Sequence, residues 1–136
     1  MGSAFAEKLS GLGCRIIAYD KYKEGFESSA VEEISEEEFF MQSDVVSIHV
    51  PWTSETKGMV DADWLNRFEK PIILLNTSRG AVIKTADLLD AIDSGKVRSA
   101  GLDVIEFEGR SLEDLELDNE SQTILDRLLS LSLIHI

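Results

Sequence analysis

The sequence predicts an α/β fold in which helices cover a doubly wound, parallel sheet. Segments with helical and strand-like patterns alternate along most of the 136 residues. The stretches between successive strands are too long for hairpins and suit crossover connections. The run at 71–75 is short, continuous and apolar, as expected of a strand that is covered on both faces. Together these observations indicate a parallel, helix-covered sheet.

The first elements are expected to be a helix, a strand and a second, shorter strand. Residues 2–12 predict a helix that packs on the sheet and ends at Gly13. The large apolar side chains of this helix are Phe5, Leu9 and Leu12. The apolar run at 14–19 predicts a strand, in which Cys14 is expected to be a small buried side chain. A polar loop follows, and residues 31–34 predict a short strand.

A second helix is predicted over 35–42, because Ser35 and Glu38 have the spacing of a capping box. The surrounding acidic cluster, residues 32–38, raises the alternative of a metal site. Carboxylates in the first turn of a helix are favoured by the helix dipole. We therefore interpret the cluster as a solvated helix start and predict no metal site.

The remaining chain continues the alternation. The expected strands lie at 44–50, 71–76 and 99–104, and the expected helices lie at 61–68 and 85–94. Gly95 is placed to end the second of these helices. Residues 111–130 combine an acidic stretch with an amphipathic helix, whose apolar side chains are Ile124, Leu125, Leu128 and Leu129.

The composition restricts the classes of partner and compartment. The formal net charge is −13, so nucleic acid and anionic membrane surfaces are not expected as partners, because both would repel the chain. A single cysteine cannot form an internal disulfide, which fits a reducing compartment. No apolar run reaches the roughly 18 residues that span a bilayer, and the first residues lack a signal-peptide pattern. The sequence therefore predicts a cytoplasmic protein.

Arg79 is the leading candidate for substrate binding. It follows the apolar run at 71–75 and a turn of small polar residues, which places it at a carboxyl end of the sheet. Open α/β sheets bind ligands at that edge. A guanidinium offers a planar fork of donors that matches a carboxylate. The alternative is an ordinary surface arginine on a loop.

Gly2 and Asp20 suggest a cofactor. A helix that begins at a glycine, followed by a strand that ends in an acidic residue, forms the second half of a dinucleotide-binding unit. Asp20 would accept hydrogen bonds from the ribose hydroxyls and repel a 2′-phosphate, so NAD is favoured over NADP. Lys21 and Lys23 soften this preference. The alternative is that Asp20 is an ordinary polar residue at a strand end.

Several motifs, in order, resemble the NAD-binding domain of the D-isomer-specific 2-hydroxyacid dehydrogenases, a family that includes D-3-phosphoglycerate dehydrogenase. The motifs are Met1-Gly2 with Asp20, Ser43 to Pro51 with Thr53, Thr56, Lys57 and Gly58, Asn76 to Gly80, Ser94-Gly95-Lys96, and Ala100 to Val104. They span about residues 1–108. The resemblance implies a Rossmann-type fold, NAD as the cofactor and a homodimer.

The resemblance also implies roles for individual residues. Met1 and Gly2 begin the helix that faces the pyrophosphate, and Asp20 binds the adenosine ribose. The other expected cofactor contacts are Val50 and Pro51 on the adenine and ribose side, Thr77, Ser78 and Arg79 near the nicotinamide, and Asp103 at the carboxamide. Arg79 is expected to be catalytic as well, because it anchors the substrate carboxylate and polarises the 2-oxygen.

The second catalytic residue implied by the family is a glutamate that raises the pKa of a histidine. It maps onto Glu108, but Gly109 stands where the family usually has proline, so Glu106 remains a competing assignment. The histidine follows a proline in the family, and the sequence contains no Pro-His pair. His49 is interpreted as a packed or hydrogen-bonded histidine, and His135 has no turn residues after it to build a site.

The ends of the sequence suggest a fragment. The first strand and the first two glycines of the cofactor motif are expected before Met1, and a substrate domain is expected elsewhere in a longer enzyme. Residues 1–130 are therefore predicted to be a fragment of the NAD-binding domain that is inactive alone. Residues 131–136 resemble translated sequencing adaptor; the alternative is an apolar terminal strand.

The predicted function is hydride transfer between NAD and a D-2-hydroxy acid, with D-3-phosphoglycerate as the best guess from family frequency alone. A different class of function is an NAD-sensing, corepressor-like binding module of the same fold. A third is a signalling-type domain, in which Asp20 or Asp44 accepts phosphate at a strand end. The ordered cofactor motifs favour the dehydrogenase.

Overall fold

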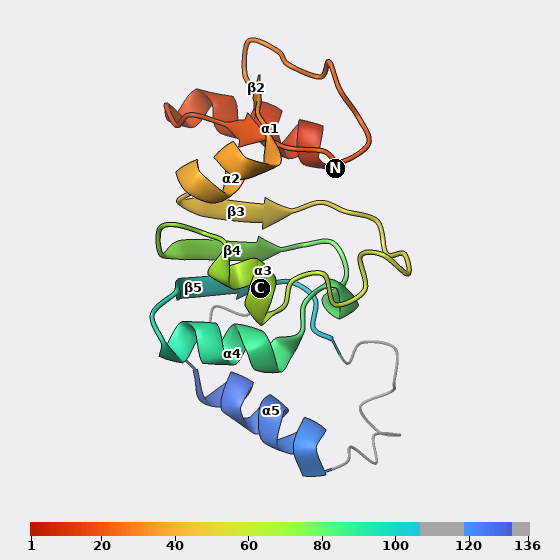
Figure 1. Ribbon diagram of the computed structural model, residues 1–136, viewed down its shortest axis with the longest axis vertical. Helices are drawn as coiled ribbons and strands as arrows, with labels where there is room; N and C mark the ends of the chain where they lie inside the picture. Colours follow the sequence, from red (N-terminus) through yellow and green to blue (C-terminus); the bar gives the residue numbers. More distant parts are fainter. Residues whose placement is uncertain (107–118, 132–136) are drawn as a thin grey trace. The chain divides into compact units, whose positions relative to one another are not determined.

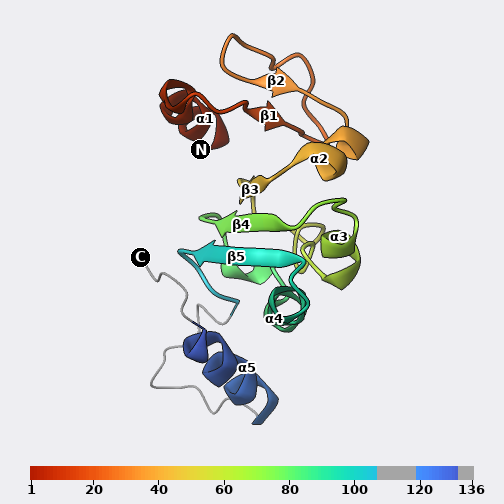
Figure 2. The ribbon, with the colours of Figure 1, turned by 90° about the vertical axis from the view of Figure 1, so that its left-hand side faces the viewer.

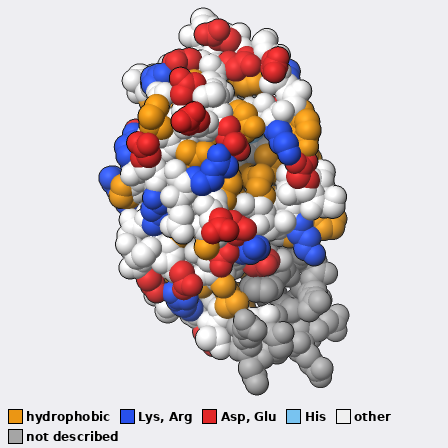
Figure 3. Space-filling model, viewed as in Figure 1, with side chains coloured by type: hydrophobic (Ala, Val, Ile, Leu, Met, Phe, Trp, Pro, Cys, Tyr) orange, Lys and Arg blue, Asp and Glu red, His pale blue; other side chains and the backbone are white. Residues whose placement is uncertain are grey.

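The structure, a computed structural model, describes residues 1–106 and 119–131. The chain divides into two compact units, a first unit of Met1–Ser43 and a second unit of Asp44–Ile136. Each has its own parallel sheet (Figure 1), as the sequence predicted of the fold class. Acidic and basic side chains are interspersed on the face drawn in Figure 3, so the negative net charge does not form a single-sign patch there.

The first unit contains two helices and two short parallel strands. Its elements are α1 (Gly2–Leu9), β1 (Ile17–Ala18), β2 (Glu32–Glu33) and α2 (Glu36–Gln42). A 3-10 turn over Ser10–Leu12 extends α1, and Gly13 ends it with a φ of 72°, a left-handed conformation that glycine adopts without strain. The strands pair in parallel, with Ile17 opposite Glu32.

Three expectations for the first unit were wrong. Cys14 is exposed, because the strand does not begin until Ile17 and the cysteine lies outside the sheet. Phe5 is exposed and Leu12 is 74% exposed, whereas Ala6 is the buried residue of α1. Two strands of two residues each offer too little surface to cover the three large side chains expected of this helix.

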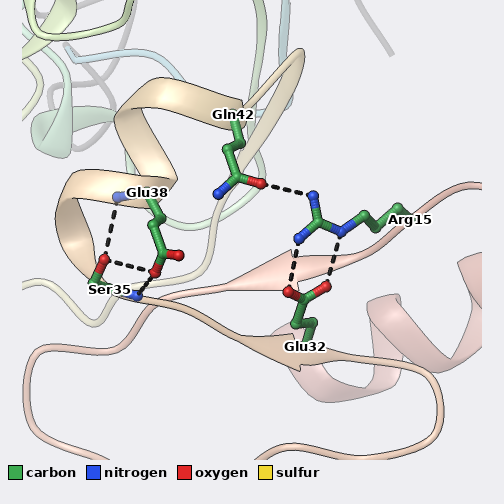
Figure 4. A network of polar contacts seen from close by, with 5 residues as sticks. All are labelled: Arg15, Glu32, Ser35, Glu38 and Gln42. Carbon is green, nitrogen blue, oxygen red and sulfur yellow. Dashed lines mark hydrogen bonds and ion pairs between the residues drawn. The ribbon is translucent and has the colours of Figure 1, made fainter.

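Polar contacts join the elements of the first unit (Figure 4). The Arg15 guanidinium donates from Nε and Nη2 to both carboxylate oxygens of Glu32, at 2.8 and 2.7 Å. Its Nη1 donates to Gln42 Oε1 at 2.7 Å, so one arginine connects β2 to the end of α2. The predicted capping box is confirmed, because Ser35 Oγ accepts from the Glu38 N–H and the Glu38 carboxylate accepts from the Ser35 N–H.

These contacts also explain the acidic cluster. The hydrogen bonds from Arg15 lower the pKa of Glu32, and the Ser35 N–H lowers the pKa of Glu38. Glu36, Glu37 and Glu38 form the first turn of α2, as predicted from the helix dipole. The cluster therefore has a structural role at the start of this helix.

The second unit continues the alternation of strands and helices. Its elements are β3 (Val45–Ile48), α3 (Ala62–Asn66), β4 (Ile72–Asn76), α4 (Thr85–Asp93), β5 (Val97–Leu102) and α5 (Asn119–Ser130). The strands are parallel in the order β3-β4-β5, with β4 in the middle (Figure 1). The last strand begins two residues before the predicted start at 99, because Val97 already pairs with Ile72 after the turn at Gly95.

The core of the second unit lies between the sheet and α3 and α4, and Figure 2 shows these helices beside β4 and β5. In β4 the alternate residues Ile72, Leu74 and Asn76 are fully buried, while Ile73 and Leu75 are half-buried. Val45 of β3 is 56% exposed. The expectation that the strand at 71–75 is covered on both faces therefore holds only in part for β4.

The predicted amphipathic helix is present as α5. Leu128 is 1% exposed, whereas Leu129 is exposed and lies off the apolar face. The Arg127 guanidinium pairs with Asp90 and Asp93 of α4, which holds α5 on that helix. Within the described residues, no helix is long and apolar enough to cross a membrane. Residues 107–118 and 132–136, which include Glu108, Gly109 and His135, lie outside the described part of the chain.

Candidate functional site

The carboxyl ends of β3, β4 and β5 coincide at one edge of the sheet in the second unit. Ile48 pairs with Asn76, and Asn76 pairs with Leu102, so the three strands end in register. The residues that follow them must therefore leave the sheet at the same edge. These are Val50 and Pro51 after β3, Thr77, Ser78 and Arg79 after β4, and Asp103 after β5. The prediction that Arg79 lies at a carboxyl end of the sheet is confirmed.

The side chain of Asn76 shapes the loop that carries Arg79. Its Nδ2 donates to the Arg79 carbonyl at 3.0 Å, and its Oδ1 accepts from the Ser78 N–H and hydroxyl at 3.0 and 2.8 Å. Asn76 is 0% exposed, so these partners satisfy an amide that would otherwise be costly to bury. No separate role was predicted for Asn76. Its position in the sequence could have indicated one, because residues 72, 74 and 76 of a strand point to the same face, and Ile72 and Leu74 are apolar.

The Arg79 guanidinium is exposed and points one donor at its own loop. Nη1 donates to the Ser78 carbonyl at 2.7 Å. Within the described residues, no hydrogen bond occupies the fork formed by Nε and Nη2. The same fork of Arg15 holds the Glu32 carboxylate in the first unit. Arg79 can therefore bind a carboxylate from solution with the same bidentate geometry.

The loop after β3 is fixed by its threonines and by a glycine. Thr56 Oγ1 donates to the Pro51 carbonyl at 2.6 Å and accepts from the Thr53 N–H at 2.9 Å. Gly58, with a φ of 62°, donates its N–H to the Ala81 carbonyl at 2.8 Å. The loops after β3 and β4 are thus hydrogen-bonded to each other. Val50 is half-buried and Pro51 is exposed at this edge.

The segment after β5 carries two carboxylates in the described part of the chain. Asp103 donates its N–H to the Asn76 carbonyl at 3.0 Å, and its side chain is exposed beside the Arg79 loop. Glu106 is half-buried, and its Oε2 accepts from the Thr85 N–H at 2.8 Å. Glu106 was predicted only as a competing catalytic residue. Its contact with Thr85 was not predicted, because the two residues lie 21 positions apart in the sequence.

The first unit holds the other predicted cofactor residues. Met1 and Gly2 begin α1, and Met1 supplies no side-chain cap to the first turn. Asp20 is exposed two residues beyond β1, at the carboxyl end of its sheet. Its Oδ1 accepts from the N–H groups of Tyr22 and Lys23, at 2.9 and 3.0 Å. Asp20 therefore also shapes a turn, which sequence analysis had not predicted.

His49 is a hydrogen-bonded histidine, as predicted. Its Nε2 lies 3.0 Å from Ser47 Oγ. Burial lowers the pKa of His49, because the charged imidazolium loses solvation. The ring is therefore neutral at pH 7, which does not suit a proton donor.

Each unit, taken by itself, presents groups that can bind an anion or a ligand with hydrogen-bonding groups. The start of α1 presents backbone N–H groups, and Arg79 presents a cation with an open fork. Asp20 and Asp103 are exposed acceptors for hydroxyl or amide donors. Within residues 1–106 and 119–131, no group of three His, Cys, Asp or Glu side chains is placed to hold a metal ion.

Comparison with known proteins agrees with this arrangement. Residues 1–128 match the family model described as D-isomer specific 2-hydroxyacid dehydrogenase, NAD binding domain. The chain is 38% identical over 136 residues to a D-lactate dehydrogenase of Streptococcus pyogenes serotype M1, which covers 99% of this chain and 40% of that protein. It is 38% identical over 109 residues to a hydroxypyruvate reductase of Blautia hydrogenotrophica, with 79% and 34% covered.

Solved structures show the same likeness. The chain superposes with a TM-score of 0.81 on the NAD-complexed form of a D-isomer specific 2-hydroxyacid dehydrogenase from Lactobacillus delbrueckii ssp. bulgaricus. The sequences are 27% identical, and the match covers 96% of this chain and 41% of that one. The chain thus spans 34% to 41% of the length of these three relatives.

The lowered pKa of His49 predicts an acid-sensitive fold. Its folded-state pKa lies below the ordinary value of about 6.5, so the unfolded chain binds this proton more readily. The stability from the neutral ring is complete above the unfolded-state pKa of about 6.5, and it is lost as the pH falls through the lower, folded-state pKa. NMR titration should give His49 a pKa below 6.5, with His135→Gln used to assign the two histidine signals. A pKa at or above 6.5 would contradict this assignment.

Proposed function

Because this chain belongs to the D-isomer-specific 2-hydroxyacid dehydrogenase family through its NAD-binding domain, we propose that it serves NAD-dependent interconversion of a D-2-hydroxy acid and its 2-oxo acid. The observation that carries the proposal is the open fork of Arg79 at the edge where β3, β4 and β5 end together. That edge also carries Asp103 and the residues after β3. The activity is proposed for a protein of the relatives' full length that contains this sequence.

We propose that Arg79 is the residue that binds substrate. Its Nε–Nη2 fork would hold the substrate carboxylate and polarise the 2-oxygen, while Asn76 fixes the backbone from which the side chain extends. Bound NAD supplies the acceptor for the hydride that leaves C2 of the hydroxy acid. The hydroxyl proton must pass to a base, and the family resemblance implies a histidine that follows a proline for that role. We do not propose His49, because its Nε2 is already engaged with Ser47 Oγ at 3.0 Å.

The cofactor roles proposed for the other residues follow the family resemblance and the donors present. The N–H groups at Met1 and Gly2 suit the pyrophosphate, and the Asp20 carboxylate suits the ribose hydroxyls. The exposed Asp103 suits the amide donors of the nicotinamide carboxamide. Val50 and Pro51 would line the adenine and ribose side, and Thr77 and Ser78 would lie near the nicotinamide.

Glu108 is the proposed second catalytic residue, in preference to Glu106. The Glu106 carboxylate already accepts the Thr85 N–H at 2.8 Å. A carboxylate that raises the pKa of a catalytic histidine needs an oxygen directed at that ring. Glu108 lies outside the described residues, so its assignment depends on the family motif and on the contact that occupies Glu106.

A small D-2-hydroxy acid is the proposed substrate. The names of two relatives, D-lactate dehydrogenase and hydroxypyruvate reductase, refer to 2-hydroxy or 2-oxo acids with short side chains. D-lactate is therefore the first compound to test. D-3-phosphoglycerate, the guess from family frequency, becomes the second. Residues 1–130 are proposed to belong to the NAD-binding domain, and a homodimer is proposed from the family resemblance.

Arg79→Lys is expected to lower kcat/KM by about 100-fold in a protein of full length, because a lysine cannot reproduce the bidentate geometry. The measurement is the rate of NADH oxidation with pyruvate or hydroxypyruvate. Arg98→Lys is the matched control, since Arg98 is an exposed arginine near the opposite end of β5. Near-normal turnover of Arg79→Lys would exclude the proposed role.

Asp20→Asn is expected to narrow the preference for NAD over NADP by about tenfold, because it removes the charge that repels a 2′-phosphate. The asparagine Oδ1 can still accept from Tyr22 and Lys23, so the turn is preserved. Asp20→Ala should also lose the turn and weaken binding of both cofactors. Calorimetric titration of the chain with NAD and NADP measures the ratio, with Glu24→Gln as the control. An unchanged ratio in Asp20→Asn would refute the assignment.

A further inference from the structure

Glu106 caps a helix from which it is distant in sequence. The Lys84 side chain, at the N-cap of α4, makes no capping hydrogen bond. Glu106 Oε2 accepts the Thr85 N–H at 2.8 Å, from the segment that follows β5. Thr85 is 4% exposed, so water competes poorly for this N–H. The helix start and the end of β5 are thereby joined.

The segment that follows β5 also packs closely against the backbone of Gly80, the residue after Arg79. A Cβ added to Gly80 would lie 1.7 Å from the Ile105 carbonyl oxygen and 2.7 Å from the Glu106 nitrogen. Only glycine permits this approach, because both neighbours are backbone atoms. Gly80 directly follows Arg79, so the loop that carries Arg79 packs against the backbone of residues 105–106.

A third contact completes the connection. The Asp103 N–H donates to the Asn76 carbonyl at 3.0 Å, and Asn76 Nδ2 in turn donates to the Arg79 carbonyl. The segment from Asp103 to Glu106 is therefore held to the end of β4 through Asp103, packed against Gly80 through Ile105, and held to the start of α4 through Glu106. The proposed catalytic Glu108 follows two residues later in the sequence.

The first turn of α4 also holds the loop after β3. Asp87 Oδ2 accepts the Ala62 N–H at 2.9 Å, and Lys84 pairs with Asp61 at 3.2 Å. The Trp64 N–H and Lys84 lower the pKa of Asp61, so the pair is ionised at neutral pH. The start of α4, which itself follows β4, thus contacts the segments that follow β3 and β5.

We propose that Glu106 is a positioning residue, whose hydrogen bond to Thr85 holds residues 103–106 against Gly80, next to Arg79. It acts through the hydrogen bond to Thr85 and does not contact the substrate. This inference rests on the proposed dehydrogenase function. The positioning role requires only that the Glu106 side chain accept a hydrogen bond. The proposed role of Glu108 requires a negative charge.

The first test measures the contact itself in this chain. Amide hydrogen exchange by NMR should show the Thr85 N–H exchanging about tenfold faster in Glu106→Ala than in the native chain, because a hydrogen bond is lost. Glu106→Gln should retain the protection, since its amide oxygen can accept. Glu69→Ala, which alters an exposed glutamate of the same unit, is the control. Unchanged exchange at Thr85 in Glu106→Ala would overturn the proposal, whether or not the protein is a dehydrogenase.

The second test measures turnover in a protein of full length. Glu106→Ala should lower kcat about tenfold, and Glu106→Gln should restore most of it with the native pH profile. Glu108→Gln should stay impaired and, in 2-oxo acid reduction, move the alkaline limb of the profile to lower pH, because the histidine loses its negative partner and its pKa falls. If Glu106→Gln is as impaired as Glu108→Gln and shifts the profile, Glu106 is catalytic and the positioning role is refuted. Absence of turnover in the native protein refutes the function, while hydrogen exchange still decides the contact.

Discussion

The buried side chain of Asn76 is the interaction on which the functional edge depends. An amide at 0% exposure must find partners inside the protein, and Asn76 finds them in Ser78 and Arg79. Its backbone carbonyl accepts from Asp103 as well. One residue at the end of β4 therefore sets the path of the chain after β4 and ties it to the chain after β5. The placement of the Arg79 guanidinium follows from this constraint.

The two units are stabilised by different means. In the second unit, the sheet and its helices bury a continuous apolar core that includes Leu65, Phe68, Ile72, Leu74, Leu88 and Leu89. The first unit buries far fewer large side chains, with Ile34 and Phe40 as the main ones. Its elements are joined by the Arg15 network and the capping box instead. Exposed ion pairs contribute little to stability, typically about 1 kcal/mol or less, so the first unit is expected to open more readily.

Local sequence patterns predicted most of the fold. Apolar runs located β3 and β4, the spacing of Ser35 and Glu38 located α2, and the order of motifs predicted the family. The wrong predictions concern the burial of side chains, which depends on residues distant in the sequence. Whether Phe5 or Cys14 is buried depends on the size of the sheet beside them, which a local pattern does not encode.

For the candidate site, the sequence predicted residues near the ends of strands but not the contacts between distant segments. The sequence placed Arg79 at the carboxyl end of a strand, where open α/β sheets bind ligands. The role of Asp103 came from the family resemblance, and β5 ends at Leu102, so Asp103 lies just outside the strand predicted to include it. It did not reveal that Glu106 caps α4 or that Gly80 packs against Ile105, since these contacts join segments about 20 or more positions apart. Asn76 could have been found, because a polar residue on the buried face of a strand needs internal partners.

The central proposal is that residues at the carboxyl edge of each sheet contact NAD. The most direct test is an NMR titration of the isotope-labelled chain with NAD, which follows the backbone amide of each residue. The account predicts saturable shifts at Gly2, Asp20, Val50, Arg79 and Asp103. Shifts confined to the opposite edge, at Asp44, Lys70 and Lys96, or no saturable shift at any residue, would contradict it.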